Sequence, residues 1–293
     1  MKRSTFTRLS TAITLTAGLL LSATASAAPS AFQVKVTGTG APLILIPGLA
    51  SSGEVWDGTV AHYCGGGKYQ CHVLTLAGFA GVPAIDGPLL PAVEQQLSDY
   101  ISTQKFKKPV IIGHSLGGFL GLKLAADHPD QVGRLIIVDS LPALGAAQMP
   151  SATSAQLKEM GEGMRSKMMT QDAATAAAGQ QQMLRTMVTK QEDIDRVAAW
   201  GKRSDRVTVI NAMADLMSDD LRQDVSRIKA PTLVLGSWIA YKDYGIKPMF
   251  EQTYKTQYQR LDGVKVELSD NARHFIMYDD PAWMYDRIDQ FLN

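Results

Sequence analysis

The fold of this chain is decided by one stretch, Pro109-Val110-Ile111-Ile112-Gly113-His114-Ser115-Leu116-Gly117-Gly118. It opens with an apolar run of the kind that forms parallel strands buried on both faces. A G-x-S-x-G pattern follows, and the small and apolar residues after it are typical of a helix. A strand, a sharp turn and a helix in this order place a serine on a strained turn with its hydroxyl exposed. The stretch therefore predicts that Ser115 is a nucleophile, the alternative being a Gly-rich turn with a structural serine.

Segments on either side of this stretch repeat the same alternation of strands and helices. Strands are predicted at 32–36, 43–46, 72–76, 135–138, 232–235 and, more weakly, 264–268, and helices at 92–104, 118–127 and 283–292. Strands that alternate with helices are typical of a parallel sheet covered on both faces. The sequence thus predicts the α/β class, with a mostly parallel central sheet flanked by helices.

One region, 143–228, interrupts this alternation. It has helical patterns without a convincing strand, and it holds nine of the thirteen methionines. Methionines spaced three and four apart share a helix face, where they either fill an ordinary core or line an apolar pocket under a mobile lid. We expect a core made of 28–142 and 229–293, with a helical lid at 143–228 inserted after the strand ending near Asp139.

A serine hydroxyl needs a base to become a good nucleophile, and the chain has only five histidines. His114 is beside Ser115 but points elsewhere, and His128 lies at a polar helix end. The other two early histidines, His62 and His72, flank the cysteine pair upstream of the serine. The remaining one, His274, follows the weak last strand and precedes the final helix, so we expect it to be the general base.

Acyl transfer also requires N–H donors for the oxyanion. Leu49 follows an early strand through Ile46-Pro47-Gly48, so its amide is expected to face that of Leu116 across the site. The chain shows no phosphate-binding loop, dinucleotide fingerprint or zinc motif, so we expect neither a cofactor nor a metal.

These features together resemble the α/β-hydrolase superfamily in its small, lid-bearing branch, over nearly the whole of 28–293. The resemblance implies a third catalytic residue, an acid. Relatives commonly place it three residues after a Gly that ends the penultimate strand, but that position here is Ile239. Asp243 is the first carboxylate beyond it, whereas Asp139 ends the preceding strand, where some members carry their acid. Both residues remain candidates, with Asp139 slightly favoured because it needs no insertion.

The predicted function is that of a serine hydrolase that cleaves an ester, lactone or thioester through an acyl-enzyme. We expect a small-molecule substrate with an uncharged or apolar acyl group. One alternative is a small peptidase of the iminopeptidase type, which would need an anionic site among Glu162, Asp215, Asp219 and Asp220. Another is a non-catalytic binding protein with this fold. Ser115 and His274 argue against the latter.

The N-terminal segment 1–27 has the pattern of a secretory signal peptide. Lys2, Arg3 and Arg8 precede a short apolar stretch, and an A-x-A site ends at Ala27. The apolar stretch is too short to span a bilayer, so we expect an exported protein, periplasmic or secreted, without a stable membrane anchor. The chain has 29 basic and 28 acidic residues and lacks basic runs, which argues against a nucleic-acid partner.

Cys64 and Cys71 are the only two cysteines. An even, closely spaced pair in an oxidising compartment predicts a disulfide. Free buried thiols are the alternative. A zinc site would need more ligands, and only His62 and His72 are near.

We predict that the mature chain begins at Ala28, because export removes the signal peptide at the A-x-A site. Intact-mass spectrometry of protein recovered from the export compartment tests this. Recovery of the chain with residues 1–27 still attached would contradict it.

Overall fold

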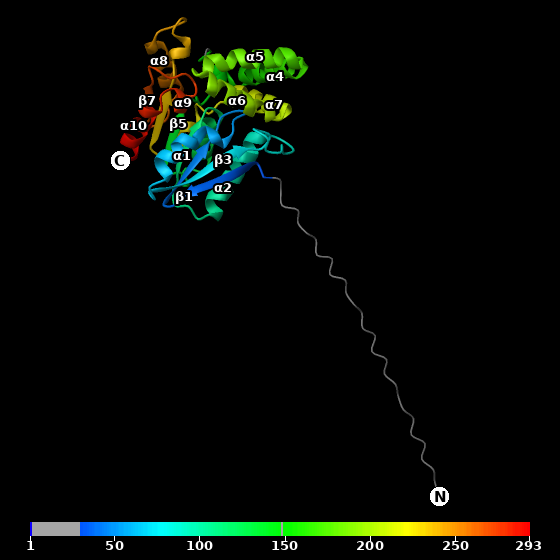
Figure 1. Cartoon of the computed structure of the whole chain (residues 1–293), viewed down its shortest axis with the longest axis vertical. Helices are drawn as coiled ribbons and strands as arrows, with labels where there is room; N and C mark the ends of the chain where they lie inside the picture. The colour runs from blue at the N-terminus through cyan, green and yellow to red at the C-terminus, as the bar shows by residue number, and fades with distance from the viewer. Residues whose placement is uncertain (2–29, 148) are drawn as a thin grey trace.

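The computed structural model describes Met1, residues 30–147 and residues 149–293. Apart from Met1, the predicted signal peptide at 1–27 lies outside the described residues. The fold is organised around a seven-stranded sheet with the order β1-β3-β2-β4-β5-β6-β7 (Figure 1). Its strands are β1 Phe32–Gly38, β2 Ala41–Ile46, β3 Tyr69–Leu76, β4 Val110–His114, β5 Arg134–Val138, β6 Thr232–Gly236 and β7 Lys265–Leu268.

Only the edge strand β1 runs antiparallel to its neighbour. β1 is largely exposed along its length, whereas β4, β5 and β6 are almost wholly buried. These burial patterns match the alternating sequence of β1 and the continuous apolar runs of the inner strands. The predicted class, an α/β fold with a mostly parallel sheet, is confirmed.

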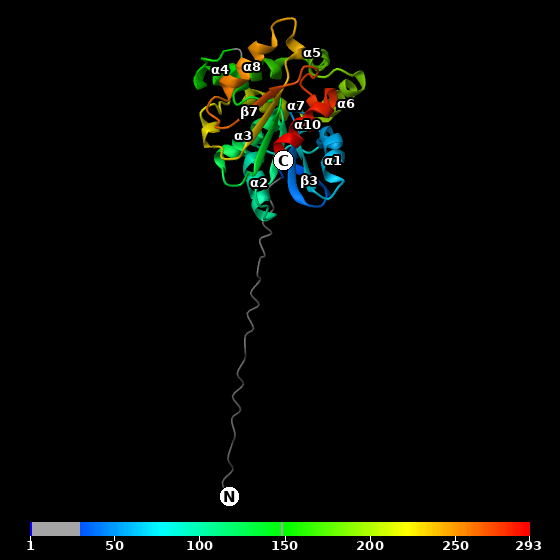
Figure 2. The same ribbon diagram turned by 90° about the vertical axis from the view of Figure 1, so that its left-hand side faces the viewer.

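Helices cover both faces of the sheet, as Figure 2 shows. The side chains of β2 alternate between two cores. Ile44 and Ile46 pack with α2, α3 and α8, while Leu43 and Leu45 pack with α1 and α10. The bounds of these helices are α1 Asp57–Cys64, α2 Leu89–Thr103, α3 Leu116–Asp127, α8 Lys247–Gln257 and α10 Pro281–Leu292, with the short α9 at Ile276–Asp279.

Four helices separate β5 from β6 and stack beyond one end of the sheet (Figure 1). They are α4 Ser154–Thr170, α5 Ala173–Met187, α6 Gln191–Arg203 and α7 Arg206–Ser218. Three of them have a side-chain cap at the N-terminus, from Thr153 to α4, Asp172 to α5 and Asp205 to α7, whereas α6 begins after Lys190 without one. No strand occurs between β5 and β6 in the described residues. The role of this insertion as a lid stays a prediction.

Three of the described helices were not expected from the sequence, α1, α8 and the short α9. In α8 only Tyr254 and Gln257 are buried, so its sequence lacks the apolar stripe by which a surface helix is identified. None of the helices within 30–147 and 149–293 combines the length and apolarity that a membrane span requires.

The predicted disulfide between Cys64 and Cys71 is present in the structure. It links the end of α1 to β3 across a Cα–Cα distance of 5.9 Å. Both cysteines are buried, so the bond fixes α1 to the sheet from within the core.

Reduction of this bond should lower the free energy of unfolding by about 2–3 kcal/mol, because the unfolded chain regains the freedom of a short loop. Urea unfolding of the protein with and without reductant measures the difference, and the Cys64→Ala/Cys71→Ala variant, insensitive to reductant, is the control. Equal unfolding midpoints for oxidised and reduced wild type would contradict the prediction.

Candidate active site

Ser115 lies on the sharp turn between β4 and α3. Its backbone has φ 52° and ψ −119°, a conformation that L-residues rarely adopt. The turn closes because its neighbours lack side chains. A Cβ on Gly113 would lie 2.2 Å from the carbonyl oxygen of Gly117, and a Cβ on Gly117 would lie 2.3 Å from that of Ile46. The half-buried Ser115 therefore stands at the carboxyl end of the sheet on a constrained turn.

His274 and Asp139 meet at the same end of the sheet. Asp139 directly follows β5, and His274 lies in the loop between β7 and α9. The Nδ1 atom of His274 is 2.6 Å from Oδ2 of Asp139. The carboxylate side chain is 10% exposed and the imidazole 22%, so the pair is shielded from most solvent but remains open on one side.

Asp139 receives further hydrogen bonds from two neighbouring elements. The Tyr254 hydroxyl donates to Oδ1 at 2.6 Å, and Ser237 donates its backbone N–H to Oδ1 at 2.7 Å and its hydroxyl to Oδ2 at 2.9 Å. Burial acts to raise the pKa of Asp139, but the hydrogen bond and charge of His274 and these donors outweigh it. The pKa of the carboxyl therefore lies below its ordinary value, and Asp139 is an anion beside His274.

His114 supports the loop that carries His274. It is buried, and its Nε2 lies 3.1 Å from the carbonyl oxygen of His274. Burial is the main cause that lowers the pKa of His114 to about 3, and the adjacent His274 adds to it. A neutral His114 donates Nε2–H to that carbonyl, and its ring packs edge-on against Trp56. This agrees with the expectation that His114 points away from the reacting side of Ser115.

The helical insertion is bonded to the residues around His274. The backbone N–H of Phe275 donates to the carbonyl of Met187 at 3.1 Å, and the Arg273 guanidinium donates to the carbonyl of Val188 at 3.3 Å. The C-terminal end of α5 is thus attached directly to the loop that presents the imidazole.

The loop expected to supply an oxyanion donor lies against Ser115. A Cβ on Gly48 would be 3.1 Å from the Cβ of Ser115, so the Pro47–Leu49 segment adjoins the serine. Leu116 is the first residue of α3, where backbone N–H groups have no acceptor within the helix. The roles of Leu49 and Leu116 as oxyanion donors remain predictions.

The other acid proposed from the sequence, Asp243, and the nearby Asp270 have surroundings different from those of Asp139. Asp243 is exposed in the loop between β6 and α8. Asp270, close to His274 in sequence, binds the Lys247 ammonium at 2.8 Å and the Trp238 indole N–H at 3.0 Å. Of the two acids proposed from the sequence, Asp139 is the one in contact with His274.

The remaining histidines have partners away from the site. His62 lies 3.4 Å from Asp289, His72 contacts the Tyr100 hydroxyl at 2.8 Å, and His128 pairs with Glu94 at 2.8 Å. Within the described part of the chain, no three His, Cys, Asp or Glu side chains are grouped so as to hold a metal ion.

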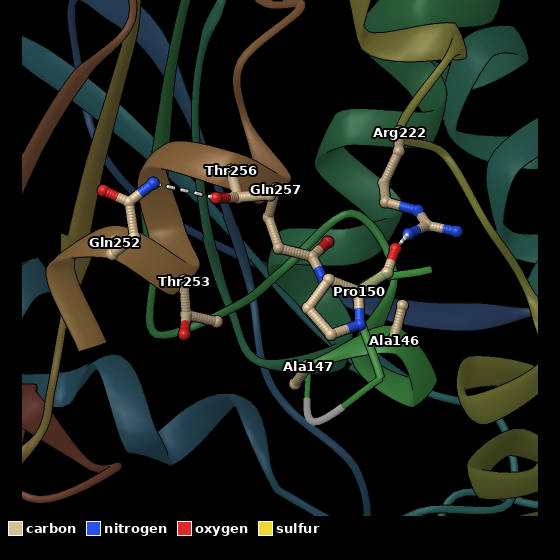
Figure 3. A pocket seen from close by; sticks show the side chains of 8 residues that line it. All are labelled: Ala146, Ala147, Pro150, Arg222, Gln252, Thr253, Thr256 and Gln257. Atoms are coloured by element: carbon tan, nitrogen blue, oxygen red, sulfur yellow. Dashed lines mark hydrogen bonds between the residues drawn. The ribbon is translucent and has the colours of Figure 1, made fainter. Parts of the chain in front are cut away.

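A pocket lies beside α8, on the side of the segment that follows β5 (Figure 3). Its lining residues are Ala146, Ala147, Pro150, Arg222, Gln252, Thr253, Thr256 and Gln257. Arg222 is already bound by the carboxylate of Asp220 and the carbonyls of Pro150 and Ala152. The Gln257 amide binds both backbone groups of Ala143. These polar groups act within the protein, and we assign no ligand to the pocket.

Sequence reasoning did not identify Tyr254 and Ser237 as part of this site. Ser237 directly follows the Gly that ends β6, so its place at the carboxyl edge was available from the strand prediction. Tyr254 lies on α8, a helix that the sequence did not predict, and no sequence pattern marked this tyrosine as a site residue.

Most of this chain is similar in sequence to known hydrolases. The family model described as the alpha/beta hydrolase family matches residues 43–287. A putative carbamate hydrolase RutD of Yersinia enterocolitica is 26% identical over 69% of this chain and 72% of its own length. A pimeloyl-acyl-carrier-protein methyl ester esterase of Nitrosomonas europaea is 25% identical over 70% and 80%.

Solved structures share the fold at lower identity. The enol-lactonase of Burkholderia xenovorans superposes with a TM-score of 0.69 at 16% identity, covering 89% of this chain and 96% of that one. A thermophilic esterase of Thermogutta terrifontis gives 0.71 at 19% identity, covering 89% and 92%.

Asp139→Asn should reduce the rate constant for hydrolysis of an activated ester on the order of 10³–10⁴-fold, because the imidazole loses the partner that fixes its tautomer. Asp243→Asn is the matched control and should stay close to wild type, since its side chain is exposed. Steady-state kinetics on variants with intact melting transitions test both. Full activity in folded Asp139→Asn together with collapse in Asp243→Asn would reverse the assignment.

Proposed function

This chain belongs to the alpha/beta hydrolase family, and from that premise we propose that it cleaves a carboxylic ester, lactone or thioester through an acyl-enzyme on Ser115. His274 acts as the general base and Asp139 as the acid of the triad. Leu49 and Leu116 supply the N–H groups of the oxyanion hole.

The observation that carries this proposal is the 2.6 Å contact between His274 Nδ1 and Asp139 Oδ2, at the sheet end where Ser115 stands on its turn. With Nδ1 bound to the carboxylate, Nε2 is the nitrogen left to accept the serine proton. Nucleophile, base and acid follow separate strands, β4, β7 and β5, which is how this fold assembles a triad in the order serine, acid, histidine.

The reaction follows from these positions. Ser115 Oγ attacks the carbonyl carbon while its proton passes to His274 Nε2, and the oxyanion is stabilised by the two backbone N–H groups. Asp139 stabilises the imidazolium. Collapse of the tetrahedral intermediate expels the alcohol or thiol, which takes the proton from His274, and a water activated by His274 then releases the acid.

We propose an uncharged or apolar acyl group, with α4 to α7 as a lid over it. The nine methionines of 143–228 supply flexible apolar side chains. Two of the similar proteins, a pimeloyl-acyl-carrier-protein methyl ester esterase and an enol-lactonase, are named for ester and lactone cleavage.

The peptidase alternative has less support. Arg165 pairs with both Glu162 and Asp215, and Arg222 pairs with Asp220. The pKa of Asp219 is raised, mainly by burial and further by the nearby charge of Asp215, although Lys123 acts in the opposite direction. The carboxylates that would bind a substrate amine are thus engaged with arginines or disfavoured as anions.

Export to the periplasm or medium is part of the proposal. Its support is the signal-peptide pattern of 1–27 and the Cys64–Cys71 bond, which suits an oxidising compartment.

Ser115→Ala should reduce turnover on the order of 10⁴-fold or more, as in other triad knockouts, while the melting transition stays unchanged because a half-exposed hydroxyl contributes little packing. p-Nitrophenyl esters of graded acyl length, lactones and aminoacyl nitroanilides, assayed in parallel, identify the bond class. Turnover confined to the nitroanilides would favour the peptidase, and failure of wild type to react with a fluorophosphonate probe would favour a binding protein. Ser115→Ala activity within about tenfold of wild type would refute the nucleophile.

A further inference from the structure

The carboxylate of Asp139 is held from two directions. His274 and the Ser237 hydroxyl contact Oδ2, at 2.6 and 2.9 Å. The Tyr254 hydroxyl and the Ser237 backbone N–H contact Oδ1, at 2.6 and 2.7 Å. Each oxygen therefore has two donors, and only one of the four is the imidazole.

We propose that Tyr254 and Ser237 are positioning residues of the reaction, which fix the plane of the Asp139 carboxylate and limit the negative charge that it presents to His274. This rests on the proposed function, in which Asp139 is the acid of the triad. Neither residue is assigned a contact with substrate, so each acts through Asp139.

The need for such positioning follows from the torsion of the aspartate side chain. Rotation about the terminal bond of Asp is soft and roughly two-fold. A bond to His274 through Oδ2 alone would leave the carboxylate plane free to turn. Tyr254 approaches the other oxygen from α8, and Ser237 approaches both from the end of β6, so rotation in either direction breaks a hydrogen bond.

The approach of Tyr254 is built into the end of β6. A Cβ on Gly236 would lie 2.6 Å from the Cζ atom of the Tyr254 ring, so only glycine lets the ring cross the strand there. Burial and the neighbouring Asp139 raise the pKa of Tyr254 well above its ordinary value. The hydroxyl therefore remains protonated and donates to the carboxylate throughout the pH range of an assay.

The three donor groups of Tyr254 and Ser237 also withdraw charge from the carboxylate. Hydrogen bonds to an anion stabilise the anion, so each donor reduces the charge available to stabilise a protonated His274. Removal of the Tyr254 hydroxyl should make the carboxylate a stronger partner for the imidazolium while leaving its plane less well fixed. These two effects have opposite signs and are measured separately, the first in the pH profile and the second in kcat.

The chain provides a matched control at the residue that directly follows α8, one helical turn after Tyr254. Tyr258 is also fully enclosed by the protein, but its hydroxyl donates to the backbone carbonyl of Ser140 at 2.8 Å. Tyr258→Phe removes the same atom at the end of the same helix without removing a donor from Asp139.

Tyr254→Phe should lower kcat roughly tenfold, the scale of a modest misplacement of a catalytic group, with KM unchanged within about twofold because no substrate contact is lost. The acid-side midpoint of the pH profile of kcat/KM should move up by about half a unit. Tyr258→Phe should leave kcat and that midpoint close to wild type. The other titratable groups facing the pair, His114 and Tyr241, are the same in both variants.

A double-mutant cycle separates positioning from general loosening of the fold. In an Asp139→Asn background the Tyr254→Phe substitution should cost less than about twofold in kcat, because its partner carboxylate is gone. Ser237→Ala, which keeps the backbone donor, should shift the pH midpoint in the same direction by a smaller amount and provides a second test where Tyr254→Phe is poorly folded.

The downfield proton resonance of the His274–Asp139 hydrogen bond gives a readout independent of turnover. It should shift in Tyr254→Phe and stay in place in Tyr258→Phe. Equal losses of kcat in the two variants, or an unmoved pH midpoint and proton resonance in Tyr254→Phe, would overturn the proposal. Absence of ester, lactone and thioester turnover in wild type would refute the proposed function, while the proton resonance would still report whether Tyr254 controls the pair.

Discussion

The structure of this site depends on a negative charge kept at the end of a buried strand. The side chain of Asp139 is 10% exposed, so water can replace little of the solvation that an anion loses on burial. The protein compensates with donors from His274, Tyr254 and Ser237. These residues come from the end of β6, α8 and the β7–α9 loop, so one carboxylate joins three segments that lie about 100 residues or more further along the chain. Loss of any one partner would leave the buried carboxylate with less compensation for its charge. The same hydrogen bonds therefore stabilise both the site and the packing of these segments.

A second constraint places the serine and the acid side by side. Ser115 and Asp139 both have φ near +50°, which costs a non-glycine residue on the order of 1–3 kcal/mol. Each is held by a backbone hydrogen bond to the next strand. Ser115 N–H donates to the Val138 carbonyl at 2.9 Å, and Asp139 N–H donates to the Leu235 carbonyl at 2.7 Å. Ser269 N–H likewise donates to the Gly236 carbonyl at 3.0 Å. The ladder thus continues past the ends of β4, β5 and β7, and it holds the strained turns at one edge.

The sequence was sufficient for the features that depend on local pattern. The apolar runs identified the strands, and the glycines around Ser115 identified the turn, because both are properties of a few adjacent residues. The sequence restricted the acid to Asp139 or Asp243 and favoured Asp139 only slightly, because the partner of His274 depends on which strand end the His274 loop crosses. Tyr254 could not be predicted from the sequence for a different reason. Only two residues of α8 are buried, so neither the helix nor its inward face could be inferred without the packed sheet beneath it.

The segment after β6 is related to the proposed role of Asp139, which directly follows β5. With Asp139 in contact with His274, the end of β6 no longer has to supply a carboxylate, and Ser237 there donates to one instead. In the proposed triad, the loop that follows β6 therefore does not have to place a carboxylate beside His274. It carries the exposed side chains of Tyr241, Tyr244 and Ile246. Such a loop can change in length and composition while the triad is preserved, provided that Gly236 still admits the Tyr254 ring and Ser237 still reaches Asp139.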